Sequence, residues 1–363
     1  MRLVYGVSGE GSGHSSRAKE MGVHLMSQGH EVRFVSYDRG FRSLNSLFDC
    51  VEIEGLHIIS VENKVSMLKT LSHNLGALPA LIRSYRKLKR VFRDYQPECV
   101  ICDFEPMTAR LAKSFELPLI SLDNQHRMRY MHYEAPKSLK IDQWITERVI
   151  AMMVPKPDVS LATTFFFGEL KNSKTFLFPP ILRSEVGALM PSDKGHHLVY
   201  LTGAYQAVID MLKRFPEERF LVYGYDKDAV DGNVSYRPFS VQGFLEDLAS
   251  ARTVIATAGF TLMSEAMYLQ KPYLAFPMQG QFEQELNGLC LEELGFGMSV
   301  PRAHESSLSH FFAQQGQYRD ALARYEYGIS NCPDASKNIA ICAKLDELLG
   351  NDAALLKQFA SHQ

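Results

Sequence analysis

Residues 256–288, which read ATAGFTLMSEAMYLQKPYLAFPMQGQFEQELNG, decide the fold predicted for this chain. The stretch predicts a strand end, a loop of small residues, a helix, a second strand and a polar loop rich in Gln and Glu. Ala258 and Gly259 stand where the strand passes into the helix, so unpaired amides and the helix dipole would face a bound anion. Glu265 follows one turn into the helix, within reach of a sugar hydroxyl beside that anion. The arrangement is typical of a nucleotide site; the alternative is an ordinary βαβ crossover whose glycine only relieves crowding.

The composition is that of a globular protein with two domains. The chain has 363 residues, too many for one typical core, and 46% of them are hydrophobic and 22% charged. The formal net charge of -2 argues against a protein that binds nucleic acid over its whole surface. No apolar run reaches the length of a membrane span, and the first residues, MRLVYGVSGEGSGH, lack the apolar segment of a signal peptide. We therefore expect a cytoplasmic protein.

Strands and helices alternate along both halves of the chain. Continuous apolar runs such as residues 3–7 predict strands of a parallel sheet covered on both faces, and helical periodicity between them predicts crossovers. The expected class is α/β, with two tandem Rossmann-like, doubly wound domains that face each other across a cleft at the carboxyl ends of their strands. The expected strands are 3–7, 31–37, 99–103, 118–122, 159–162 and 175–178 in the first half, and 198–201, 220–223, 234–236, 253–256 and 273–276 in the second.

The boundary between the domains is expected just after the Pro179-Pro180 pair. An N-terminal domain of residues 1–180 would be followed by an irregular linker over 181–197. The C-terminal domain would extend over 198–330. Helices over 331–363 would then pack back toward the N-terminal domain.

The loop after the first strand, GEGSGH at residues 9–14, is a second candidate site. It does not fit the dinucleotide pattern GxGxxG, because His14 stands where the last glycine is required, although Asp38 would match the ribose-binding acid of an NAD site. A histidine beside glycines that let a ligand approach closely suits a general base near neutral pH, with Glu10 as a second candidate base. The alternative is that His14 caps the helix or binds substrate.

The six cysteines are predicted to be free thiols. Cys99 and Cys102 form a CxxC pair, but the pair lies within the apolar run ECVICDF. Residues three apart in a strand point to opposite faces, which disfavours both a redox pair and a zinc site. Buried, unpaired cysteines of a cytosolic protein are the better interpretation.

Four stretches carry a resemblance to a known group of enzymes: VSGEGSGHSSRA, GHEVRFVSY, PECVICDFEPMTARLAKSFELPLI and residues 256–288. Together they resemble the GT-B glycosyltransferases, most closely the family 28-like peptidoglycan N-acetylglucosaminyltransferase and related uncharacterised microbial proteins. The resemblance implies that the C-terminal half holds a nucleotide-sugar, most often a UDP-sugar, with no resident cofactor. It also implies a carbohydrate or lipid-linked acceptor.

The resemblance assigns donor-binding roles in the C-terminal half. Glu265 would bind the donor ribose, and Phe239 stands where backbone groups hold the base. Ala258 replaces a histidine of plant-type relatives, so amides and the helix dipole would bear the phosphate charge. Glu285 replaces a glutamine of the peptidoglycan enzyme, which leaves the donor sugar open. The implied donor-binding set is Thr202, Gly203, Phe239, Gly259, Phe260, Thr261, Glu265, Gln281, Gln284 and Glu285, of which the last three would read the sugar hydroxyls.

The resemblance places the acceptor and the base in the N-terminal half. His14 would deprotonate an acceptor hydroxyl as it attacks the anomeric carbon from the face opposite the leaving group, with inversion and without a metal ion. Asp103-Phe104-Glu105 resembles the DxD metal motif of the other glycosyltransferase fold but lacks the second Asp, so acceptor-cleft lining or a helix start is the preferred interpretation. The implied acceptor-binding residues are Gly11, Gly13, Asp103, Glu105 and His126.

A basic stripe lies on the helix predicted within residues 66–95. Arg83, Arg86, Lys87 and Arg90 recur three or four residues apart, opposite an apolar stripe. A solvated helix face is the simplest interpretation. Docking on an anionic acceptor, or on anionic lipid at the inner face of a membrane, is the alternative.

The sequence thus favours a glycosyltransferase, and two alternatives from other classes stay open. One is a UDP-sugar epimerase or hydrolase on the same fold, which would convert its UDP-sugar without a second substrate. The other is a non-catalytic nucleotide-sugar-binding protein, which would bind UDP and lose nothing measurable on His14→Ala.

Overall fold

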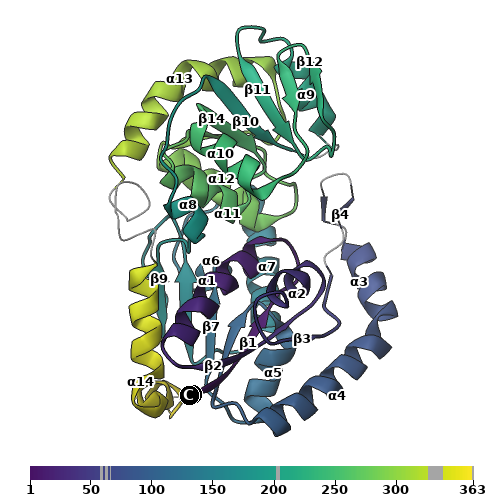
Figure 1. Cartoon of the computed structure of the whole chain (residues 1–363), viewed down its shortest axis with the longest axis vertical. Coiled ribbons are helices and arrows are strands. Elements are labelled where there is room, and N and C mark those ends of the chain that lie inside the picture. Colours follow the sequence, from purple (N-terminus) through teal and green to yellow (C-terminus); the bar gives the residue numbers. More distant parts are fainter. Residues whose placement is uncertain (58–59, 62–63, 66, 202–204, 326–337, 362–363) are drawn as a thin grey trace. The chain divides into compact units, whose positions relative to one another are not determined.

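The chain forms two compact units. The computed structural model describes residues 1–57, 60–61, 64–65, 67–201, 205–325 and 338–361 (Figure 1). The first unit consists of Met1–Ile59, Ser66–Arg183 and Asn338–Gln363, and the second of Ser60–Val65 and Ser184–Lys337. The main segment of the second unit begins at Ser184, inside the stretch expected as a linker, and the C-terminal helix α14 (Ile339–Ser361) belongs to the first unit.

The first unit is built on a seven-stranded sheet with the strand order β3-β2-β1-β6-β7-β8-β9. All of these strands pair in parallel. The chain runs outward from β1 to one edge and then returns to β6 beside β1, and such a reversal leaves a crevice at the carboxyl ends of the two central strands. The strands are β1 (Arg2–Val7), β2 (Glu31–Ser36), β3 (Cys50–Glu52), β6 (Cys99–Asp103), β7 (Leu119–Asp123), β8 (Val159–Thr163) and β9 (Thr175–Phe178).

Helices cover both faces of this sheet (Figure 1). Successive β1 side chains point to opposite faces, so Tyr5 packs in the core with α1 and α14, whereas Val4 packs in the core with α4 and α5. Cys99 and Cys102 likewise fall into opposite cores and are free thiols, as predicted. The helices of this unit other than α14 are α1 (Gly13–Ser27), α2 (Asp38–Leu44), α3 (Met67–Gly76), α4 (Leu78–Tyr95), α5 (Pro106–Ser114), α6 (His126–Tyr130), the 3-10 turn η1 (Lys137–Leu139) and α7 (Lys140–Met153).

The second unit repeats this plan with the strand order β12-β13-β11-β10-β14-β15-β16. Among the described strands of this sheet, only the edge pair β12–β13 is antiparallel, and the reversal of strand order falls between β10 and β14. The strands are β10 (His196–Tyr200), β11 (Arg219–Tyr223), β12 (Ala229–Asp231), β13 (Val234–Tyr236), β14 (Thr253–Ala256), β15 (Tyr273–Ala275) and β16 (Gly297–Ser299), with a separate hairpin of β4 (Ser60–Val61) and β5 (Lys64–Val65). The helices are α8 (Ser184–Gly187), α9 (Gln206–Leu212), α10 (Val241–Ser250), α11 (Phe260–Tyr268), α12 (Phe282–Glu293) and α13 (Glu305–Ala323).

The strands predicted from apolar runs are confirmed, with ends that differ by at most two residues. The sequence missed the two-residue strands β4 and β5 and three of the three-residue strands, β3, β12 and β16. The residues of β3, β12 and β16 are mostly exposed or only partly buried, so these strands form no apolar run that would reveal them. No helix in the described part of the chain combines the length and the apolar character needed to cross a membrane.

Candidate active site

The loop between β1 and α1 brings His14 to the crevice of the first sheet. Val7 of β1 pairs with Asp103 of β6, and the amide of Ser8 continues this pairing by donating to the Asp103 carbonyl at 2.9 Å. A side chain on Gly9 would collide with the backbone carbonyl of Tyr37, and Gly11 has a φ of 74°, a conformation that favours glycine. The glycines therefore allow a tight passage from strand to helix, and α1 begins at Gly13 with His14 in its first turn.

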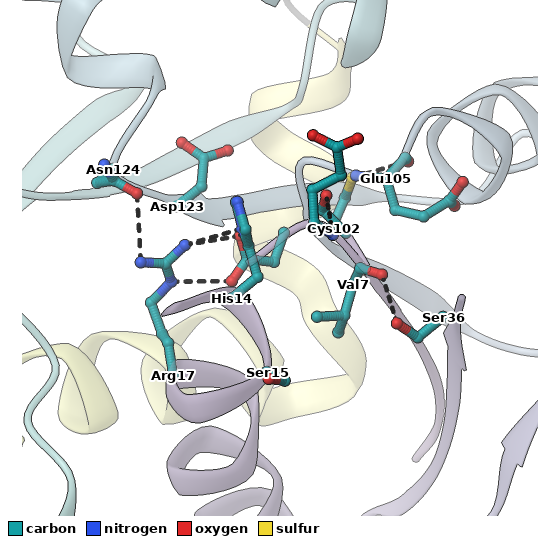
Figure 2. A network of polar contacts seen from close by, with 12 residues as sticks. Val7, His14, Ser15, Arg17, Ser36, Cys102, Glu105, Asp123 and Asn124 are labelled. Carbon is teal, nitrogen blue, oxygen red and sulfur yellow. Dashed lines mark hydrogen bonds and ion pairs between the residues drawn. The ribbon is translucent and has the colours of Figure 1, made fainter. Parts of the chain in front are cut away.

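His14 is hydrogen-bonded to a buried carboxylate (Figure 2). Its Nδ1 lies 2.6 Å from Oδ1 of Asp103, whose side chain is fully buried, while the His14 side chain is 14% exposed. A carboxylate accepts only, so the neutral imidazole that fits this bond carries its proton on Nδ1 and its lone pair on Nε2. Asp103 thus orients His14 and leaves Nε2 able to accept a proton.

Arg17 completes this network from the same helix. Its Nε donates to Asp103 Oδ2 and its Nη2 to Asp103 Oδ1, both at 2.8 Å, while its Nη1 donates to Asn124 Oδ1 at 3.3 Å. The Arg17 Nη2 is also 3.3 Å from His14 Nδ1, but the shorter bond to Asp103 takes the Nδ1 proton. Arg17 and Asp103 therefore form a bidentate, buried ion pair next to the imidazole of His14.

Each member of the Arg17–Asp103 pair shifts the pKa of the other in the direction that favours the charged form. Burial by itself would raise the pKa of Asp103, but the Arg17 guanidinium and His14 outweigh it and hold that pKa below its usual value. Burial would likewise lower the pKa of Arg17, yet Asp103 raises it above its usual value. Asp103 is therefore ionised at neutral pH and available as the partner of His14.

The second candidate base, Glu10, has a different neighbour. Its Oε1 lies 3.8 Å from Nδ1 of His57, and Oδ2 of Asp38 lies 3.4 Å from the same nitrogen. Asp38, considered above for an NAD site, is thus beside His57 at the first residue of α2. The loop directs Glu10 and His14 to different partners.

Glu105 takes the helix-start role of the two that the sequence offered. It is the N-cap of α5, with one oxygen accepting from the Met107 amide at 2.8 Å and the other from the Thr108 amide at 2.7 Å. Its side chain is 1% exposed. Asp103 and Glu105 therefore bind different partners, although they are separated by one residue.

His126 forms a second histidine–aspartate pair at the end of the neighbouring strand β7. Its Nδ1 lies 2.7 Å from Asp123 Oδ2, and its amide donates to Asp123 Oδ1 at 2.8 Å. The side chain is fully buried, whereas that of His14 is partly exposed. Asn124 lies between Asp123 and His126 in the chain and accepts a hydrogen bond from Arg17, so it links this segment to the network of His14 and Asp103.

In the second unit, the turn from β14 to α11 presents a helix N-terminus. Gly259 is the N-cap, and apart from its two chain neighbours no atom of the described residues lies within 4 Å of the position that a side chain would take there. The two carbonyls before it are held by neutral donors: Tyr273 donates its hydroxyl to Thr257 O at 2.7 Å, and the Asn287 amide donates to Ala258 O at 2.8 Å. Phe260 and Thr261 are the first residues of α11, where backbone amides have no partner within the helix.

The remaining predicted donor residues lie in α11, α12 and the loop before α10. Glu265 is 2% exposed in α11 and lies near Tyr273, whose pKa is raised by burial and further by this carboxylate. Gln284 accepts the Met278 amide at 3.0 Å, and Phe239 is 56% exposed. Gln281 and Glu285 are the N-cap and a first-turn residue of α12, and Thr202 and Gly203 lie outside the described residues.

Sequence reasoning gave no role to Arg17 or Asn124. A signal for Arg17 was present, because it follows His14 by three residues on a helix and so shares its face. Asn124 stands two residues after a predicted strand, but its partner Arg17 lies 107 residues away in the sequence, on helix α1. The roles of the predicted donor and acceptor residues stay predictions.

Comparisons with known proteins place this geometry in a family. A sequence model described as glycosyl transferase family 1 matches residues 1–315. An uncharacterized glycosyltransferase of Methanosarcina acetivorans is 26% identical over 330 residues, which cover 82% of this chain and 85% of that protein. The resemblance of the present chain to the peptidoglycan enzyme in particular stays a prediction.

Solved structures share the fold. The calicheamicin glycosyltransferase CalG4 has a TM-score of 0.68 at 12% identity, with 97% of this chain and 99% of that chain covered. The spinosyn rhamnosyltransferase SpnG, complexed with thymidine diphosphate, has a TM-score of 0.63 at 14% identity, with 97% and 100% covered. At these identities the likeness shows the fold alone. The chain belongs to glycosyl transferase family 1 and has the GT-B fold.

Proposed function

We propose that this glycosyltransferase moves a sugar from a nucleotide-sugar to an acceptor hydroxyl, with His14 as the general base. The observation that carries the proposal is the 2.6 Å bond between His14 Nδ1 and the buried Asp103 carboxylate. It leaves Nε2 to take the acceptor proton, and the carboxylate stabilises the imidazolium that forms. A base that activates the attacking hydroxyl without forming a covalent intermediate fits a single displacement, so we expect inversion at the anomeric carbon.

The second unit would bind the donor. The open N-cap at Gly259 and the first amides of α11 suit a diphosphate, since a helix N-terminus attracts negative charge. SpnG, which shares the fold, was solved with thymidine diphosphate; for this chain we expect a UDP-sugar. Glu265 would bind the ribose, Phe239 would contact the base, and the α12 start would read the sugar hydroxyls.

No resident cofactor or metal ion enters this proposal. The leaving diphosphate gains negative charge as its bond to the sugar breaks, and oriented amides at a helix N-terminus stabilise such charge. In the first unit, both oxygens of Asp103 already accept hydrogen bonds from Arg17, and both oxygens of Glu105 cap α5.

The acceptor would be a carbohydrate or a lipid-linked sugar. Arg83, Arg86, Lys87 and Arg90 of α4 are exposed, whereas Leu88 of the same helix is buried. Docking of this basic face on anionic membrane is testable by co-sedimentation with vesicles that contain phosphatidylserine. Each lost charge weakens such binding by about 1 kcal/mol, so we expect the R83Q/R86Q/R90Q variant to leave the vesicles at much lower salt; equal retention rules this docking out.

The function is tested by supplying candidate donors with and without acceptors. A thermal-shift screen first identifies the nucleotide-sugar, because stabilisation grows with affinity. Transfer to an acceptor, with the product anomer read by NMR, is the expected result. Rapid conversion of the donor without any acceptor would instead indicate an epimerase or hydrolase, and binding with no turnover that His14→Ala changes would indicate a binding protein.

A further inference from the structure

The buried carboxylate of Asp103 needs a positive charge to balance it. A buried carboxylate is strongly stabilised by one nearby positive charge, and two groups at Asp103 could supply it: a protonated His14 or the guanidinium of Arg17. If His14 supplied it, the imidazole would already hold a second proton and could not act as a base. The positive charge must therefore come from elsewhere for the proposed reaction to proceed.

Arg17 is placed to supply that charge. It contacts both Asp103 oxygens through two nitrogens at 2.8 Å, in the planar geometry that suits a carboxylate. Its side chain is 5% exposed, so solvent screens the pair little. Asn124 fixes the third guanidinium nitrogen.

The surrounding groups leave this balance intact. His14 faces Arg17 of its own helix, Asp103 of β6 and the ring of Phe104. On β1, burial and then Asp103 raise the pKa of Tyr5 well above its usual value, so its hydroxyl stays neutral. On β7, Asp123 is paired with His126.

We infer that Arg17 is a positioning residue that keeps His14 neutral: its guanidinium, and not an imidazolium, balances the buried Asp103 carboxylate, so that Nε2 is free to accept the proton of the acceptor. The inference rests on the proposed function of His14. In the reaction the acceptor proton passes to Nε2, and the oxygen uses the electron pair of that bond to form its bond to the anomeric carbon. The bond from this carbon to the diphosphate breaks, and its electron pair leaves with the diphosphate.

Arg17→Met tests the inference because it removes the charge but keeps much of the side-chain volume. Loss of a positive charge beside the imidazole favours its protonated form. The acidic limb of the kcat/KM profile should therefore move up by roughly one to three pH units. At pH 7 kcat/KM should fall about 10-fold or more and recover as the pH rises, which simple structural damage would not do. Arg17→Lys keeps the charge and should leave the limb near its original position even if kcat falls.

A second readout needs no catalysis. The ring ¹⁵N chemical shifts of His14, assigned by comparison with His14→Gln, should show a neutral ring protonated on Nδ1 at pH 7 in the native protein and an imidazolium in Arg17→Met. His126 serves as an internal reference, because its partner is Asp123 and not the Asp103 carboxylate that Arg17 contacts. Arg33→Met, which breaks an exposed arginine–aspartate pair of 2.7 Å elsewhere in the unit, is the matched control and should change neither readout.

The outcomes separate this inference from the proposed function. A neutral His14 ring and an unmoved acidic limb in folded Arg17→Met would overturn the role of Arg17 while His14 could still be the base. An imidazolium in Arg17→Met, with no transfer by the native protein from any donor, would support the charge balance but overturn the proposed function. If Arg17→Met does not fold, Arg17→Gln measured with added methylguanidinium gives the same test: recovery of a neutral His14 ring is expected, and no recovery contradicts the inference.

Discussion

The loop between β1 and α1 in the first unit and the turn between β14 and α11 in the second both border the reversal of strand order in their sheets, although they follow strands on opposite sides of that reversal. Around His14 the structure gathers side-chain charge: a carboxylate, a guanidinium and an imidazole within 3.3 Å of one another. Around Gly259 the groups are mainly backbone groups: the carbonyls of the two preceding residues accept hydrogen bonds from Tyr273 and Asn287, and the described residues leave space at the N-cap.

The difference matches what the two proposed tasks would require. Proton transfer needs a base held in one tautomer, which requires charged partners at short distance. Binding a diphosphate needs unpaired amides and room. Substitutions in the first region should therefore change rates, whereas substitutions in the second should change donor affinity.

Asp103→Asn should have the largest effect. An amide in place of the carboxylate no longer fixes the His14 proton on Nδ1 and leaves the Arg17 charge unbalanced, so we expect kcat to fall about 10²- to 10⁴-fold. Nucleotide affinity, measured by calorimetry, should stay within about twofold. A large loss of nucleotide affinity with kcat preserved would contradict the assignment of Asp103 to proton transfer rather than to donor binding.

Glu265→Gln, in contrast, should lower the affinity for UDP. Loss of a charged hydrogen bond to ribose costs about 1.5–3 kcal/mol, or roughly 10- to 100-fold in UDP affinity. Calorimetric titration with UDP measures it, and Glu292→Gln in the adjacent helix α12 is a control with the same chemical change. UDP affinity unchanged by Glu265→Gln and by Glu265→Ala would overturn the ribose assignment.

Gly259→Ala sharpens the comparison with a single methyl group. The backbone of Gly259 has φ −71° and ψ 130°, which alanine also adopts, and among the described residues other than its chain neighbours the methyl would meet no atom within 4 Å. The melting temperature should therefore not fall, while donor affinity should drop about 3- to 10-fold because the methyl occupies space assigned to the diphosphate. Unchanged affinity would place the diphosphate elsewhere.

The smallest effect concerns stability in acid. The pKa of Asp103 is lowered in the folded state from 3.8. Its contribution to stability is therefore complete above that unfolded value and is lost as the pH falls through the lower folded value. Urea unfolding between pH 5 and pH 3 should show a steeper loss of unfolding free energy in the native protein than in Asp103→Asn, by up to about 1 kcal/mol per pH unit. Equal slopes would show that Asp103 gains nothing from Arg17.

Much of the fold could be read from the sequence because a buried parallel strand is a continuous apolar run, as in β1 and β6. Strands β3, β12 and β16 escaped because their residues are mostly exposed or only partly buried and therefore form no apolar run. His14, Asp103 and Gly259 were identifiable one by one, since each stands where a strand ends.

The pairing of these residues was not predictable. His14 and Asp103 are 89 residues apart in the chain, and only the strand order that sets β6 beside β1 brings them together. Arg17 resembles any helical arginine until its contact with Asp103 is known. Glu105 was predicted to line the acceptor cleft or to start a helix; its bonds to two amides show that it caps α5, and its acceptor role stays a prediction.

The central claim is that His14 is the base and takes no part in holding the donor. Its most direct test is His14→Ala, with UDP binding measured by calorimetry and transfer measured with the donor and acceptor that the native protein uses. We predict UDP affinity within twofold of the native value and transfer reduced by about 10²-fold or more. Transfer that stays within tenfold of the native rate, or UDP binding that is lost along with transfer, would contradict the account.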